Sequence, residues 1–121
     1  MESGAILDDQ ITASSTHSNG LSARKSRLHS GKAWSAGSED EHQWLQIDLG
    51  VEYKTNVTKV ATQGKSDGNE WVKEYKLDYS NNGTNFQYYR EPGQNTDKVV
   101  SSFPSKKPSL SCISFIISEL F

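Results

Sequence analysis

The sequence lacks the features that define several large classes of protein. Its 121 residues contain a single cysteine, Cys112, so no disulfide forms within the chain. No apolar run reaches the roughly 18 residues that a membrane-spanning helix needs. The first residues lack the basic and apolar segments of a signal peptide, so we expect none in this chain. The net charge of −2 gives no overall attraction to nucleic acid or to an anionic membrane.

The chain also lacks complete sets of residues for two kinds of chemical site. Residues 64–68 match the hydrolase pattern G-x-S-x-G, but all three histidines precede Ser66 and a strand-like run follows it. We therefore predict a turn and no catalytic residue. Residues 39–42 (EDEH) supply three carboxylates and an imidazole, but neighbours in an extended loop cannot all face one ion. We expect a solvated acidic turn, no metal site and no cofactor.

What the sequence does contain is β patterning. Apolar and polar side chains alternate from Trp44 to Leu49, which is typical of a half-buried strand. Residues 56–64 and 71–79 have further strand patterns, and Asn82-Gly83 predicts a tight turn back to a strand near residues 86–88. No helical pattern of useful length occurs, and hydrophobic residues make up 33% of the chain. Together these features predict one all-β domain, a sandwich or barrel with a modest core.

The apolar positions of these strands define the expected core. It comprises Trp44, Leu45, Ile47, Leu49, Val60, Trp71, Tyr75, Leu77, Tyr79, Phe86 and Tyr88.

Six sequence blocks resemble, in order and spacing, the discoidin domain, also called the coagulation-factor five/eight type C domain. They are MESGAILDDQITASST, ARKSRLHSGKAW, QWLQIDLG, VTKVATQG, WVKEYKLDYSNNGTNFQYY and NTDKV. The resemblance implies a β-sandwich of jelly-roll type. It also implies an extracellular recognition or adhesion module, secreted or part of a surface protein, that binds lipid headgroups, glycans or proteins through loops at one end. In this family, Trp34 matches a core position and Arg27 belongs to the scaffold.

The resemblance covers residues 1–99, and the closing strands of the family pattern are not found in residues 100–121. We therefore expect a partial discoidin domain over 1–99, followed by a divergent tail over 100–121. The fold would then be incomplete at its C-terminal end. The tail contains the apolar run CISFIISELF, which predicts either a buried strand or a segment that fits the domain poorly. A truncated gene model or a short splice form would explain such a tail.

Charge is distributed unevenly along the chain. The stretch of residues 11–37 contains Arg24, Lys25, Arg27 and Lys32 but no acidic residue. A basic loop of this kind favours a sulfated glycan, a carboxylate or a phosphate headgroup as ligand. Two other interpretations stay open: the charges are simply solvated, or Arg27 forms a structural ion pair.

The resemblance places the projecting loops at residues 16–23, 31–38 and 64–70. The candidate ligand-binding residues on and beside them are Asn19, Leu21, Arg24, Lys25, Asp67 and Asn69. Leu21 is the single large apolar residue in the first and third loops, so we expect weak insertion into a bilayer. This favours a cell-surface or matrix glycan or protein as ligand. The alternatives are a carbohydrate-targeting module of a larger enzyme and a module that binds anionic phospholipid.

Two N-x-S/T sequons, at Asn56 and Asn82, are candidate N-glycosylation sites. Sequons arise often by chance. Together the two therefore favour the secretory route only slightly.

Overall fold

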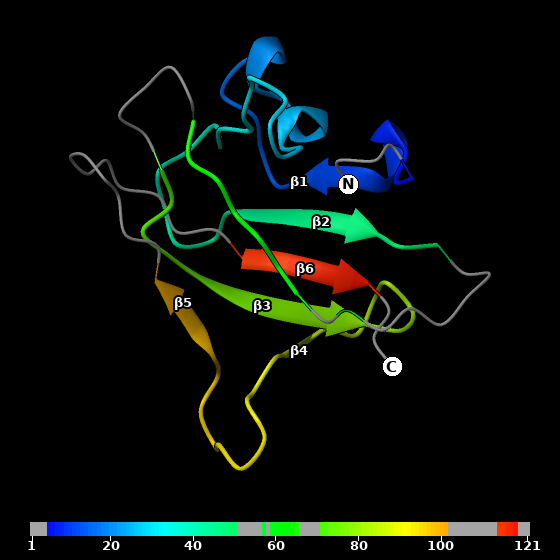
Figure 1. The fold of residues 1–121 in the computed structure, drawn as a ribbon, viewed down its shortest axis with the longest axis vertical. Coiled ribbons are helices and arrows are strands. Elements are labelled where there is room, and N and C mark those ends of the chain that lie inside the picture. The colour runs from blue at the N-terminus through cyan, green and yellow to red at the C-terminus, as the bar shows by residue number, and fades with distance from the viewer. Residues whose placement is uncertain (1–4, 51–56, 58, 66–70, 102–113, 119–121) are drawn as a thin grey trace.

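The computed structural model describes residues 5–50, 57, 59–65 and 71–101, together with the backbone of 114–118 (Figure 1). These residues contain short 3-10 turns and strands but no α-helix, which confirms the prediction of an all-β fold. In chain order the elements are η1 (Asp8–Gln10), β1 (Ile11–Ala13), η2 (Asn19–Leu21), η3 (Ala23–Lys25), β2 (Trp44–Asp48), β3 (Glu74–Ser80), β4 (Gln87–Tyr88), β5 (Val99–Ser101) and β6 (Ser114–Ser118).

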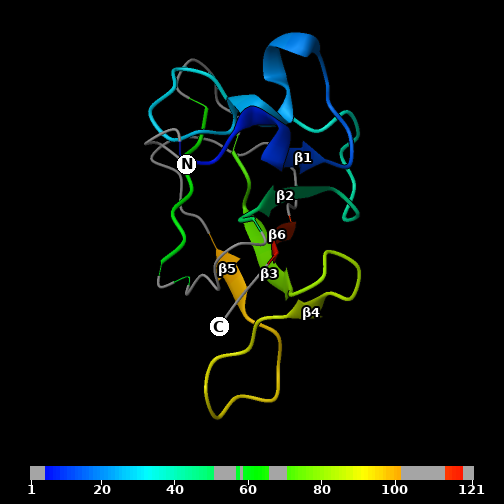
Figure 2. The same ribbon diagram turned by 90° about the vertical axis from the view of Figure 1, so that its right-hand side faces the viewer.

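The strands form one sheet in the order β1-β2-β6-β3-β4, and β5 pairs with the other half of β3 (Figures 1 and 2). β1 is antiparallel to β2, whereas β6 runs parallel to both of its neighbours. The C-terminal apolar run therefore contains a strand in the middle of the sheet. The predicted burial of its side chains lies outside what the structure describes. The domain boundary at residue 99 stays a prediction.

β2 follows directly from its alternating sequence. Leu45 and Ile47 lie on one face, opposite Ala13 and Ile11 of β1. The strand ends before Gly50, whose φ of 87° is a conformation that glycine adopts without steric cost. The amide of Gly50 donates a hydrogen bond of 2.8 Å to the side-chain oxygen Oδ1 of Asp48, which stabilises this turn.

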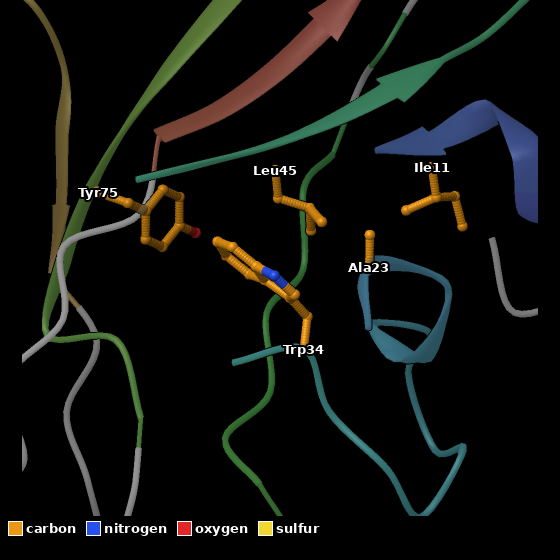
Figure 3. Close-up of a cluster of buried hydrophobic side chains, with 5 residues drawn as sticks. All are labelled: Ile11, Ala23, Trp34, Leu45 and Tyr75. Carbon is orange, nitrogen blue, oxygen red and sulfur yellow. The ribbon is translucent and has the colours of Figure 1, made fainter. Parts of the chain in front are cut away.

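The hydrophobic core lies between the sheet and the segment that connects β1 to β2 (Figure 3). Ile11, Leu45 and Tyr75 extend from strands, and they meet Ala23 and Trp34 from the connecting segment. Leu45 and Tyr75 confirm the core predicted from strand patterns, and burial of Trp34 confirms what the resemblance implies. Burial of Ala23 has no signal in the sequence, because alanine occurs freely in cores and on surfaces.

The prediction is wrong for two residues that it assigned to the core. Val60 and Tyr88 expose 37% and 45% of their surface. The described part of residues 56–64 contains no strand, so the β-branched pattern around Val60 is not buried by pairing. Tyr88 lies directly opposite Asp78, which places it on the polar face of β3, where the Lys76 ammonium sits 4.8 Å from its ring centroid.

The remaining members of the predicted core are partly buried. They are Trp44, Ile47, Leu49, Trp71, Leu77, Tyr79 and Phe86.

The predicted turn at Asn82-Gly83 is present. β3 and β4 pair antiparallel on either side of it, and Gly83 has a φ of 70°. The connection spans residues 81–86, so it is longer than a two-residue hairpin loop.

Residues 89–98 form an arm between β4 and β5. The arm projects from the edge of the sheet that these two strands form beside β3 (Figures 1 and 2). The amide of Gln94 bonds to the carbonyl of Glu91, and Gly93 has a φ of 81°, as in a type II turn. Two ion pairs cross the base of the arm, Arg90–Asp97 at 3.0 Å and Glu91–Lys98 at 2.7 Å. These charges are therefore paired with one another.

Asp78 is a source of pH-dependent instability in the sheet. Burial raises its pKa from 3.8 to about 6, although nearby Lys76 opposes this change. Its Oδ1 is buried and makes no hydrogen bond within the described part of the chain. The unfolded chain ionises near pH 4 and the folded chain near pH 6, so stability falls as pH rises through this interval and stays lowered above it.

We therefore expect Asp78→Asn to stabilise the protein at pH 7.5 and to have little effect near pH 3.5. The full pKa change corresponds to about 3 kcal/mol. Screening of this partly exposed carboxyl reduces the expected gain to about 1–2 kcal/mol. Urea unfolding at both pH values measures it. Asp97→Asn is the matched control, and it should destabilise the protein at pH 7.5. The bond from Arg90 lowers the pKa of Asp97, so the ionised carboxylate stabilises the folded chain. Equal gains from Asp78→Asn at both pH values would contradict the assignment.

Candidate ligand-binding site

Residues 14–43 connect β1 to β2 and contain the first two predicted loops (Figures 1 and 2). Backbone hydrogen bonds join these loops, from His17 N to the Ser35 carbonyl at 2.9 Å and from Ser35 N to the Leu21 carbonyl at 3.1 Å. The indole Nε1 of Trp34 donates to the carbonyl of Ser15 at 2.8 Å. The two loops therefore form one layer that is attached to the core through Trp34.

Gln43 is a buried polar residue at the base of this layer, and its side chain bonds to three partners. Its Oε1 accepts hydrogen bonds from the hydroxyls of Ser14 and Ser15, and its Nε2 donates to Asp40 at 2.9 Å. The bond from Gln43, followed by that from the His42 amide, lowers the pKa of the Asp40 carboxyl. Asp40 therefore acts as a structural acceptor in the acidic turn. Across the described residues, no group of three or more His, Cys, Asp or Glu side chains is arranged to hold a metal ion.

The sequence contains no local sign of the role of Gln43. It lies just outside the alternating segment that begins at Trp44, and an isolated glutamine is usually exposed. Its burial is explained by its partners in the folded chain, since a buried amide needs hydrogen bonds.

Four of the six candidate residues lie on consecutive 3-10 turns. η2 carries Asn19 and Leu21, and η3 carries Arg24 and Lys25. Asn19 and Arg24 are exposed, whereas Leu21 and Lys25 are partly buried. η3 packs on β1, the edge strand of the sheet.

The other two candidates, Asp67 and Asn69, lie outside the described residues, as does Asn56.

Arg27 has a structural partner, which is one of the interpretations left open by the sequence. Its guanidinium bonds to the Asp8 carboxylate and to the Ile6 carbonyl, both at 2.7 Å. The bond from Arg27 is the main cause of the lowered pKa of Asp8, and the charges of Arg24 and Lys25 add to it. Asp8 thus offsets the charge of Arg27. Within the described chain, Arg24 and Lys25 form no direct ion pair.

Comparison with known proteins agrees with this architecture. The family model of the F5/8 type C domain matches residues 10–116. The chain belongs to the F5/8 type C, or discoidin, family. It is 43% identical over 110 residues to rat Discoidin, CUB and LCCL domain-containing protein 2, covering 82% of this chain and 14% of that protein. It is 39% identical over 118 residues to human Neuropilin-1, covering 86% of this chain and 13% of that protein.

Bovine Lactadherin is 37% identical over 109 residues, which are 82% of this chain and 25% of that protein. The discoidin chain thus spans a quarter or less of the length of these three relatives. The family match extends into β6, whose backbone lies between β2 and β3. In the described residues no helix is long and apolar enough to cross a membrane.

Proposed function

We propose that the chain is a non-enzymatic recognition module of an extracellular or cell-surface protein. It binds an anionic glycan or protein ligand through the loop layer of residues 14–43. Membership of the discoidin family supports a binding role. The observation that carries the choice of ligand is the exposure of Arg24, beside Lys25 on η3, while Asp8 offsets the nearby charge of Arg27.

The rigid attachment of these loops supports the same proposal. Bonds between the two loops and from Trp34 to Ser15 hold η2 in place before any ligand arrives, and η3 packs on β1. A preorganised surface loses less conformational entropy on binding. Asn19 adds an exposed amide on the preceding turn η2, which suits the hydroxyl groups of a sugar or the amides of a peptide backbone.

Insertion into a lipid bilayer is less well supported. Leu21 is partly buried, so little of its apolar surface remains for contact with lipid. The exposed large apolar residues of the described chain are Leu7, Val60, Tyr88 and Val99, none of which lies on η2 or η3.

Arg24→Glu with Lys25→Glu should weaken binding to an immobilised sulfated glycan at least about tenfold. Wild-type binding should itself fall steeply when salt is raised, because exposed charges are screened over about 10 Å at 0.1 M. Surface plasmon resonance at two salt concentrations measures both effects. The thermal melt should change little, because Arg24 is exposed and neither residue forms an ion pair within the described chain.

The matched control is Arg90→Glu with Lys98→Glu on the arm, which makes the same change in net charge at the opposite edge of the sheet. It should leave glycan binding nearly unchanged. Equal losses from both double variants would refute the site. Binding to anionic liposomes that survives high salt and is lost in Leu21→Ala would instead support the phospholipid alternative.

A further inference from the structure

The sequon at Asn82 lies in a turn that the proposed ligand site does not use. Residues 81–86 connect β3 to β4, at the edge of the sheet opposite β1 (Figure 1). η3 packs on β1, so the width of the sheet separates this turn from Arg24 and Lys25. The side chain of Asn82 is exposed. A sequon on an exposed turn is sterically able to carry a glycan.

The turn holds the Asn82 side chain through its oxygen. Oδ1 accepts hydrogen bonds from the amides of Thr84 and Asn85, each at 2.9 Å, and from the hydroxyl of Ser80 at 2.8 Å. Nδ2 makes no hydrogen bond to any residue that the structure describes. The atom that would carry a glycan is therefore separate from the atom that stabilises the turn.

The rest of the turn is equally independent of Nδ2. Ser80 is 2% exposed, and its hydroxyl oxygen accepts the amides of Asn82 and Gly83 at 3.2 and 3.1 Å. The hydroxyl of Thr84 donates to the Asn82 carbonyl at 3.3 Å. Substitution of Nδ2 would leave all of these bonds in place.

We propose that Asn82 is an N-glycosylation site whose glycan leaves the turn intact and projects from the edge opposite the ligand loops. The proposal rests on the extracellular location in the proposed function. In the reaction, Nδ2 forms a bond to the anomeric carbon of an oligosaccharide carried on a lipid pyrophosphate. The bond from that carbon to the pyrophosphate oxygen breaks, and the lipid pyrophosphate leaves with its electron pair. The proton lost by Nδ2 passes to the solvent, and nothing is oxidised or reduced.

The test is translation of the full chain, behind a signal sequence, in the presence of endoplasmic-reticulum microsomes. Asn56→Gln is introduced in all samples so that Asn82 is the one remaining sequon. Peptide N-glycosidase treatment in ¹⁸O-water followed by mass spectrometry should show Asn82 converted to ¹⁸O-labelled Asp. The readout does not depend on folding, and protease protection shows that the chain entered the microsome. A protected chain with unmodified Asn82 would overturn the proposal.

Three variants separate the sequon from the turn. Thr84→Ala should abolish the modification, and Thr84→Ser should retain it, since a hydroxyl is present again. Asn81→Gln is the matched control, because Asn81 is an exposed neighbour outside any sequon, and it should leave the modification intact. Loss of the modification in Asn81→Gln would contradict the assignment to Asn82.

Binding provides a second readout, for the position of the glycan. Glycosylated protein and unglycosylated Asn82→Gln should bind a heparin surface with affinities within about twofold of each other. Markedly weaker binding of the glycosylated form would overturn the proposed position. If neither form binds heparin, the proposed ligand class fails, while the mass spectrum still decides modification of Asn82.

Discussion

Leu45→Ala should lower the free energy of unfolding by about 2–5 kcal/mol, the range for removing a large buried aliphatic side chain. Leu45 is 1% exposed and lies at the centre of the core, between the sheet and Trp34 (Figure 3). Its removal leaves a cavity that the paired strands on either side cannot close by moving. Urea unfolding, followed by tryptophan fluorescence, measures the loss.

Ile47→Ala is the matched comparison on the same face of β2. The strand pattern alone predicts a similar loss of about 2–5 kcal/mol for this residue. The structure leaves Ile47 partly buried, so we expect the smaller loss of about 1–2 kcal/mol. If Leu45→Ala does not fold, Leu45→Val should still be measurable at a cost of about 1 kcal/mol. A loss in Ile47→Ala as large as that in Leu45→Ala would contradict the described burial.

Trp34→Ala should cost about 3–5 kcal/mol, because it removes a large buried ring from the same cluster. Trp34 is 8% exposed, and its Nε1 bonds to the Ser15 carbonyl across the two loops. We also expect this variant to weaken glycan binding under conditions where it remains folded, because the loop layer loses its attachment to the core. Calorimetry and surface plasmon resonance on the same samples measure the two effects.

Trp34→Phe separates packing from hydrogen bonding. It keeps most of the apolar contact but leaves the Ser15 carbonyl without its donor, so we expect a loss of about 1–3 kcal/mol. Trp44→Phe is the matched control, because Trp44 is partly buried and its indole makes no hydrogen bond within the described chain. A larger loss in Trp44→Phe than in Trp34→Phe would show that the core is centred elsewhere.

Local sequence patterns were sufficient for the elements whose signals are themselves local. The alternation from Trp44 to Leu49 predicts β2, and Asn82-Gly83 predicts the turn between β3 and β4. Both patterns act through neighbouring residues, either by the period of a pleated strand or by the φ values that glycine tolerates. The family could also be identified from the sequence, because several such blocks occur in a fixed order.

Burial and pairing were decided by the tertiary structure, because they depend on residues far away in the chain. The sequence pattern predicts both Val60 and Leu45 as core residues, but of the two only Leu45 lies on a strand paired with β1 and in one buried cluster with Trp34. The position of β6 between β2 and β3 likewise has no local signal.

The roles of the charged and polar residues were also set by distant partners. Arg24 and Arg27 are close in the sequence and chemically identical, yet Asp8, 19 positions before Arg27, pairs with Arg27. Gln43 is buried because the hydroxyls of Ser14 and Ser15, which follow the end of β1, donate hydrogen bonds to its side-chain oxygen. The sequence by itself therefore determined the family, the strand β2 and the turn after β3. Only the tertiary structure decided which cations face the solvent and which polar groups hold the loops, because those outcomes depend on contacts between distant segments.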